Sequence, residues 1–211
     1  MSIDNTDFES ITESDIEELI TGQVSEGLHI EYKQELYGSS DSNKKEALKD
    51  ISAFANSHGG HLILGMAEKN GLPDSLTGLV NINPDSEILR LEQMSRTGIE
   101  PRIPGIKIRA IPLSNGTHSI VVRIPTSWNS PHRVSFQGSN KIWIRNSAGV
   151  HEANIEELGN LFTLSTSAFE KIQNFRVERL KAITDGLTPR PLQQGGRLIL
   201  HIIPLSAFIF K

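Results

Sequence analysis

The sequence predicts an α+β fold with a mixed, mainly antiparallel sheet flanked by helices. Two segments of alternating character, IKIRAIPL and HSIVVRIP, lie on either side of Asn115-Gly116, the strongest short-range signal for a β-hairpin. An amphipathic helix, a Gly-Gly turn and an apolar strand follow one another over residues 44–66. Helices and strands do not alternate strictly, and this disfavours a parallel sheet built from βαβ units.

The sequence of the N-terminal part predicts a helix and a half-buried strand. It then predicts a second helix that leads into a buried strand. Ser14 to Glu17 has the spacing of a capping box before the short helix DIEELI. Residues 28–33 alternate between apolar and charged side chains, a pattern typical of a strand with one buried face. Residues 44–57 carry apolar side chains at helical spacing, and the following run HLILGM is apolar on both faces, as in a central strand.

We expect the apolar face of the helix over residues 44–57 to pack against the HLILGM strand. Its members include Ile51 and Phe54, and a tight Gly59-Gly60 turn joins the two elements. The next segment, residues 68–84, contains several Gly and Pro residues and is predicted to be a loop. A further helix is expected over residues 85–95.

The C-terminal part predicts one more strand, KIWIR, and then two helices. Asn154 with Glu157 caps a helix that is expected to end at Phe162, and an amphipathic helix is expected over residues 168–183. A Gly- and Pro-rich linker follows. The last segment, LILHIIPLSAFIFK, is strongly apolar. Either it pairs with the sheet, or the chain is truncated there and a further module or a partner covers it.

Composition excludes several classes of protein. The 211 residues contain 21 Lys and Arg against 25 Asp and Glu, a net charge of −4, which argues against binding of nucleic acid through bulk positive charge. The absence of Cys excludes a disulfide scaffold, a thiolate zinc site and a Cys nucleophile. No apolar run reaches the roughly 18 residues of a membrane helix, and the acidic N-terminus has no signal-peptide pattern. We expect a cytoplasmic protein without a membrane segment.

Acidic residues beside the first two predicted strands form a candidate site. Glu31 and Lys33 share one face of a strand, and a turn at Gly27 would let Glu26 join them. Glu68 lies just beyond the end of the HLILGM strand. Carboxylates grouped in this way can hold a divalent cation such as Mg²⁺ or Mn²⁺. The alternative is a solvated strand face with a surface ion pair, followed by a polar loop.

Basic residues recur along the later strands and could contact a phosphate backbone. With Trp128 and Trp143 nearby, such residues could line a groove that holds nucleic acid. The alternative is that they form the solvated side of a sheet. The candidate residues are Arg109, Arg123, Arg133 and Arg145, with Lys107 and Lys141 beside them. No GxxxxGK[ST] motif is present, so an ATP site is not expected.

The segments EGLHIEYK, KDISAFANSHGGHLILGMAEKNG, TGLV and IWIRNSAGVHEANIEEL resemble the Schlafen AlbA-like domain over residues 22–163. The resemblance implies an α+β domain that binds RNA or DNA. Some Schlafen-type proteins cleave transfer and ribosomal RNA with three acidic residues and a divalent metal. Glu26 and Glu31 match the first two acids, and Lys33 matches the adjacent Lys. The usual Asp of the third acid is Ala67 here, and Glu68 is the next acidic position.

These observations predict a nucleic-acid-binding domain and leave its chemistry open. One alternative is a metal-dependent endoribonuclease that acts on structured RNA, with Glu26, Glu31 and Glu68 as metal ligands and Lys33 stabilising developing charge. A second is a non-catalytic adaptor, and a third is a regulatory or oligomerisation domain, of a transcription or defence protein. Schlafen cores combine two lobes, so by analogy a homodimer is expected. The expected division is a helical region at 1–21, the Schlafen AlbA-like domain at 22–163, an amphipathic helix at 164–185 and a linker with the C-terminal segment at 186–211.

Overall fold

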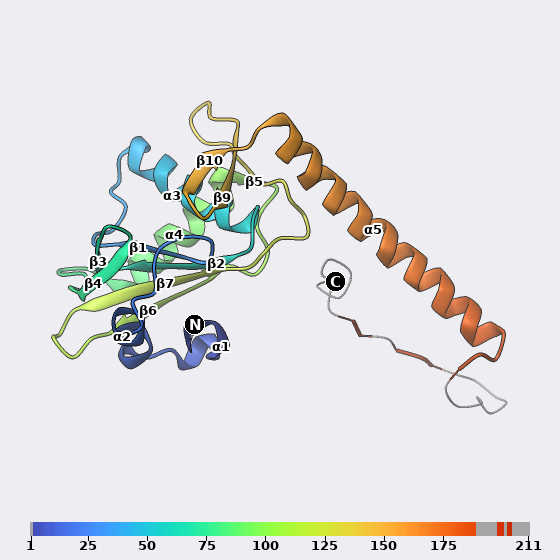
Figure 1. Ribbon diagram of the computed structural model, residues 1–211, viewed down its shortest axis with the longest axis horizontal. Helices are drawn as coiled ribbons and strands as arrows, with labels where there is room; N and C mark the ends of the chain where they lie inside the picture. Colours follow the sequence, from blue (N-terminus) through green and yellow to red (C-terminus); the bar gives the residue numbers. More distant parts are fainter. Residues whose placement is uncertain (1, 189–197, 201, 204–211) are drawn as a thin grey trace.

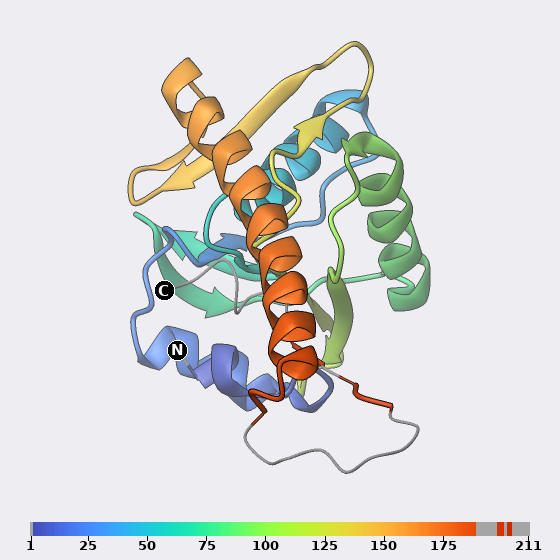
Figure 2. The same ribbon diagram turned by 90° about the vertical axis from the view of Figure 1, so that its right-hand side faces the viewer.

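The computed structural model describes residues 2–188, 198–200, 202 and 203. Within this part of the chain, the strands form two four-stranded sheets and a two-stranded hairpin, and helices pack around them. A long helix, α5 (Ile155–Thr184), starts beside β10 and runs away from the sheets (Figures 1 and 2). The α+β class and the mainly antiparallel pairing are confirmed.

The first sheet has the strand order β1-β2-β7-β6. β1 (Ile30–Lys33) and β2 (Gly60–Leu64) pair in parallel, whereas β7 (His118–Ile124) is antiparallel to both β2 and β6 (Lys107–Pro112). The hairpin predicted at Asn115-Gly116 is therefore confirmed as the β6–β7 connection.

The second sheet has the strand order β10-β9-β8-β5 and is antiparallel throughout. Its strands are short. β9 contains the predicted KIWIR strand and forms a hairpin with β10. The bounds are Ile99–Glu100 for β5, Arg133–Val134 for β8, Lys141–Asn146 for β9 and Gly149–Glu152 for β10.

Both faces of the first sheet are covered, which explains why β2 is apolar on both sides. Leu62 and Leu64 pack in one buried cluster with residues of α3 (Asp41–Ala55) and α4 (Pro84–Gly98). Ile63 points to the other face and packs with the N-terminal segment, which contains α1 (Ser2–Asn5), a 3₁₀ turn (Phe8–Ser10) and α2 (Glu13–Thr21). Figure 1 shows α2 and α3 on opposite sides of this sheet.

The predicted packing of α3 on β2 is confirmed. Ile51 and Phe54 are fully buried in the same cluster as Leu62 and Leu64. The N–H of Gly59 bonds to the Phe54 carbonyl at 2.9 Å and ends the helix, with Gly59 at a φ of 68°. Glycine adopts this left-handed conformation without the steric cost that other residues incur.

The HLILGM segment is not a single strand, and residues 68–84 are not simply a loop. Gly65 has a φ of 94°, and an added Cβ would lie 3.1 Å from the Cα of Gly78. The chain bends there, because a strand conformation cannot continue through this dihedral angle. β3 (Met66–Lys69) then pairs with β4 (Leu72–Leu76) in a short hairpin.

The ends of two predicted helices also differ from expectation. The capping box of α2 uses Thr12 and Asp15 rather than Ser14 and Glu17, because the Asp15 carboxylate accepts hydrogen bonds from both the Thr12 N–H (2.8 Å) and its hydroxyl (2.7 Å). The two helices predicted after Asn154 form one continuous α5. The residues between them, 163–167, contain neither Gly nor Pro to break the helix.

Among the helices that the structure describes, none combines the length and apolar composition needed to cross a bilayer. The expected linker and the apolar C-terminal segment fall largely outside the described residues.

Candidate functional site

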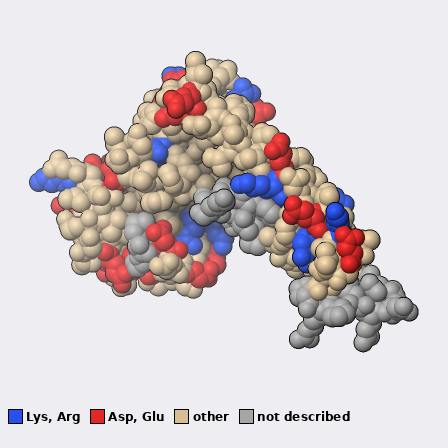
Figure 3. All heavy atoms as spheres, turned by 45° about the vertical axis from the view of Figure 1, so that its right-hand side comes forward, with Lys and Arg blue, Asp and Glu red and all other residues tan. Residues whose placement is uncertain are grey.

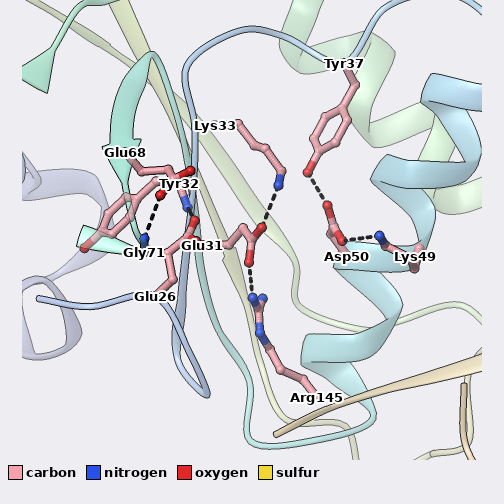
Figure 4. Close-up of polar contacts among 10 residues, drawn as sticks. All are labelled: Glu26, Glu31, Tyr32, Lys33, Tyr37, Lys49, Asp50, Glu68, Gly71 and Arg145. Atoms are coloured by element: carbon pink, nitrogen blue, oxygen red, sulfur yellow. Dashed lines mark hydrogen bonds and ion pairs between the residues drawn. The ribbon is translucent and has the colours of Figure 1, made fainter. Parts of the chain in front are cut away.

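The candidate site is centred on Glu31 of β1, whose carboxylate lies between two cations (Figure 4). Its Oε1 is 2.6 Å from the Lys33 ammonium nitrogen, and its Oε2 pairs with the Arg145 guanidinium. The Arg145 side chain is 2% exposed and lies over the Phe54 ring at 4.3 Å. Nε and Nη1 of Arg145 are buried without a hydrogen-bond partner in the described structure. Stacking on the Phe54 ring therefore adds to the support of a guanidinium that, among the described residues, is paired with Glu31.

These contacts lower the pKa of Glu31 and raise the pKa of Lys33. Burial acts to raise the pKa of Glu31, but the hydrogen bond from Lys33 and the charge of Arg145 outweigh it, and the pKa is lowered. Burial acts to lower the pKa of Lys33, but its bond to Glu31 outweighs this and the pKa is raised. Both groups are therefore charged at neutral pH.

The C-terminal end of α3 holds β9, and thus Arg145, in place. The Asn56 side-chain NH₂ donates to the carbonyls of His132 (2.8 Å) and Trp143 (2.9 Å), and its Oδ1 accepts from the His132 N–H (2.7 Å). The Ser57 hydroxyl oxygen accepts from the Arg145 N–H at 2.8 Å. The AFANS segment is thus a brace between the two sheets, which gives its polar residues a structural role.

The structure brings Glu26 to the same hollow as Glu31 and Lys33. A turn places it there, with the Gly27 N–H bonded to the Ile30 carbonyl at 3.1 Å. One carboxylate oxygen of Glu26 accepts from the Tyr32 N–H at 2.8 Å. Burial raises the pKa of Glu26 despite this bond.

Glu68 does not join this hollow. It lies on β3, and its carboxylate accepts from the Gly71 N–H at 2.7 Å, which closes the β3–β4 turn. Figure 4 shows Glu26 between Glu68 and Glu31. Glu68 is near enough that its charge contributes slightly to raising the pKa of Glu26.

The three predicted metal ligands are engaged with the chain's own donors. Both oxygens of Glu31 pair with cationic side chains, and Glu26 and Glu68 each accept a main-chain hydrogen bond. Within the described residues, no group of three or more His, Asp or Glu side chains is arranged to hold a metal ion. The arrangement as it stands does not fit a shared cation, and the metal site remains a prediction.

Sequence reasoning missed Asp50, Tyr37 and Lys49. Asp50 of α3 is 2% exposed; it accepts from the Tyr37 hydroxyl at 2.7 Å and lies 3.6 Å from the Lys49 ammonium. Burial raises the pKa of Asp50 and raises that of Tyr37 well above its usual range. A signal was available, since Asp50 lies four residues before Phe54 and so falls on the buried face of the helix.

Two hollows meet at Lys49. The first, of about 260 Å³, is the one lined by Glu26, Glu31 and Lys33, together with Asp50, Arg145 and the β9–β10 turn. The second, of about 350 Å³, lies between α3 and β9. Its charged and aromatic lining residues are Lys45, Glu46, Lys49, Lys141 and Trp143, so three cations face one carboxylate. Lys49 lines both hollows, so the two hollows are adjacent and share a cationic side chain at their border.

The structure does not bring the predicted arginines together. Arg109 and Arg123 donate to main-chain carbonyls of the N-terminal segment and hold it on the first sheet. Arg133 pairs with Glu100 at 2.7 Å on the surface. Arg145 lies in the site. Figure 3 shows acidic and basic side chains interspersed on the face that it draws, which agrees with the negative net charge.

Comparison with protein-family models matches residues 26–154 to the family described as Schlafen, AlbA_2. Among solved structures, the DIP2311 protein from Corynebacterium diphtheriae is similar at 15% sequence identity and a TM-score of 0.45, over 67% of this chain and 29% of that one. The chain thus spans less than a third of that protein's length. No curated protein matches. Because the family match covers more than half of the sequence, the chain belongs to the Schlafen AlbA_2 family.

Proposed function

We propose that this domain binds nucleic acid in the depression between α3 and β9, here called the basic groove. It is defined by Lys33, Lys45, Lys49, Lys141 and Trp143. The observation that carries the proposal is the position of Lys49 in both hollows, because it places a cationic side chain at the border that the two hollows share. Membership of the Schlafen AlbA_2 family supports the same function.

The charge balance of the groove predicts which side chains would contact phosphate. Lys33 is committed to Glu31, and Lys141 pairs with Glu152 at 2.7 Å on the surface. Lys45 contacts a main-chain carbonyl, that of Gln137, at 3.3 Å, so no carboxylate offsets its charge in that contact. Lys49 lies 3.6 Å from the Asp50 carboxylate, a looser contact than those of Lys33 and Lys141 with their carboxylates. Lys45 and Lys49 are therefore the principal phosphate contacts in this proposal. The aromatic face of Trp143, now under the Lys141 ammonium at 5.3 Å, offers a stacking surface for a base.

The test compares two pairs of charge-removing substitutions. Lys45→Gln with Lys49→Gln should weaken binding of a fluorescent single-stranded RNA or DNA about tenfold or more at low salt. The slope of log affinity against log salt should fall by about 1.4, since roughly 0.7 counterions are released per contact to a single strand. Fluorescence anisotropy over a salt series measures both quantities.

The control pair removes two exposed cations elsewhere, Lys69→Gln with Lys181→Gln. Affinity and salt slope should then stay close to those of the wild type. Equal weakening by the two pairs, or no affinity of the wild type for RNA or DNA at low salt, would refute the basic groove.

Metal-dependent cleavage of structured RNA by Glu26, Glu31 and Glu68 remains a prediction, as do the homodimer and the cytoplasmic location. The engagement of all three carboxylates with the chain's own donors favours the non-catalytic adaptor. Incubation with Mg²⁺ or Mn²⁺, against a chelator, distinguishes the two. Cleavage that requires the metal and disappears in Glu31→Gln would establish the endoribonuclease, whereas binding without cleavage in the wild type would establish the adaptor.

A further inference from the structure

Strand β6 is one edge of the first sheet, and the main-chain groups on its outer side are free. The Leu113 N–H bonds to the Thr117 carbonyl at 2.9 Å in the turn of the β6–β7 hairpin. Because bonding alternates along an antiparallel pair, Ile108 and Ala110 direct their N–H and C=O groups away from β7. Among the described residues, no main-chain group bonds to them there. Such an edge is a template for one more strand.

A hollow of about 320 Å³ adjoins the start of this edge, between α4 and the residues that lead into β6. Its lining includes Leu89, which is 53% exposed, and the half-buried Ile103 and Ile106. A strand added to β6 would turn alternate side chains towards α4, so its apolar side chains would lie at this hollow. Main-chain bonding at an edge, combined with a pocket for alternate side chains, is a common way to recognise an extended segment.

The segment LILHII, residues 198–203, has the composition and length of a strand that fits this edge. Leu198 is 96% exposed, Leu200 76% and Ile202 84%. These residues are two apart, so they share one face of an extended chain. Gly196 lies two residues before the segment and Pro204 follows it, and both residue types bound strands. The segment thus matches the six residues of β6 in length.

We propose that the LILHII segment of one copy of this chain adds as a strand to the β6 edge of a second copy. Within one chain the three leucine and isoleucine side chains stay exposed, so the chain's own sheet does not cover them. In the pair they face α4 and the hollow of the second copy, while the segment's main chain bonds to Ile108 and Ala110. The exchange is reciprocal, so it gives a closed, symmetric dimer in which both β6 edges are covered.

The first test measures the oligomeric state of the 211-residue chain by sedimentation equilibrium. The wild type should shift from monomer to dimer as its concentration rises. Leu200→Asp with Ile202→Asp should raise the dimer dissociation constant at least about tenfold, because the added charges would have to be buried against α4. The control, Phe169→Asp with Val177→Asp, places the same charges at exposed apolar positions of α5 and should leave the dissociation constant close to that of the wild type.

A single substitution, Ala110→Pro, blocks the edge itself. It removes an N–H that β7 does not use, and edge strands tolerate proline at such positions, so the sheet should be retained. The dimer dissociation constant should again rise at least about tenfold, and circular dichroism of each variant verifies the fold. A wild type that stays monomeric at every concentration would overturn the proposal. Equal weakening by the control pair on α5 would overturn it as well.

The second test distinguishes a segment on an edge from two segments that pair with each other. Ala110→Pro keeps the segment intact, and Leu200→Asp with Ile202→Asp keeps the edge intact, so a mixture of the two variants can form one of the two contacts. Fluorescence anisotropy of one labelled variant, titrated with the other, should show tighter association than either variant has with itself. No gain on mixing would exclude pairing at the edge. These substitutions lie outside the basic groove, so its binding is tested independently.

Discussion

Helices α3 and α5 both carry a stripe of apolar residues, but Phe54 of α3 and Phe169 of α5 lie in opposite environments. Phe54 of α3 is fully buried beneath Arg145, whereas Phe169 of α5 is 61% exposed. The difference arises because α3 packs against β9 and the first sheet, whereas α5 runs away from both (Figure 1). An amphipathic pattern therefore predicts that a helix has a buried face, but not which of its apolar side chains are buried.

The largest expected effect is on folding of the body. Phe54→Ala should lower the free energy of unfolding by about 3–5 kcal/mol, because it leaves a cavity in the core and removes the surface under Arg145. Phe169→Ala should change the same quantity by less than about 0.5 kcal/mol, since exposed side chains contribute little to folding. Urea denaturation followed by tryptophan fluorescence measures both, because Trp128 and Trp143 lie in the body. Similar losses in the two variants would contradict the comparison.

A smaller effect is expected on the pH dependence of stability, through His61 and the N-terminal segment beside it. Burial lowers the pKa of His61 to about 4 from 6.5. His61 is therefore neutral at pH 7, and its Nε2 accepts a hydrogen bond from Arg123 at 2.7 Å. Its Nδ1, 3.3 Å from Asp4, forms no ion pair at that pH. The same arginine donates to carbonyls of residues 3 and 6, so protonation of His61 would disturb the attachment of α1.

Proton uptake by His61 in the unfolded chain determines how the stability of the fold depends on pH. The unfolded chain takes up a proton on this histidine below pH 6.5 and the folded chain does not, so stability is full above 6.5 and falls towards pH 4. The expected loss from this group is about 3 kcal/mol. In His61→Gln, where an amide oxygen replaces Nε2 as acceptor, this part of the pH dependence should disappear. Denaturation curves at several pH values provide the measurement, and an unchanged acid limb in the variant would contradict it.

The smallest effect concerns Asp50, a buried carboxylate of the body. Its pKa is raised above 3.8 by burial, so the ionised form destabilises the fold as pH rises through the raised pKa. Asp50→Asn retains an oxygen for the Tyr37 hydroxyl and removes the charge. The free energy of unfolding of Asp50→Asn, relative to that of the wild type, should therefore increase as the pH is raised from below 3.8 to 7. A difference that is independent of pH would show that Asp50 does not titrate in this range.

Local patterns in the sequence predicted most of the body. Asn115-Gly116 correctly predicted the β6–β7 hairpin, and the apolar residues Leu62 to Leu64 correctly predicted that both faces of the sheet are covered. The break at Gly65 was not predicted, because it depends on the close approach of Gly78, thirteen residues further along.

The candidate site was only partly predictable, because some of its residues come together through tertiary packing and not through local sequence. Glu26, Glu31 and Lys33 are close in sequence, and a turn and a strand suffice to bring them together. Arg145 and Asp50 join them only through tertiary packing. Arg109 and Arg123 have the sequence context of surface cations, but they hold the N-terminal segment, and no local pattern distinguishes the two uses.

The brace formed by Asn56 has a consequence for how this domain can diversify. Because a side chain at the end of α3 sets the place of β9, the loops that connect β8 to β9 and β9 to β10 do not have to do so. Such loops tolerate insertions and substitutions when the elements that they connect are held independently. These loops can thus change in sequence and length while Arg145 stays at Glu31, so the rim of the site can be altered without a change in the core.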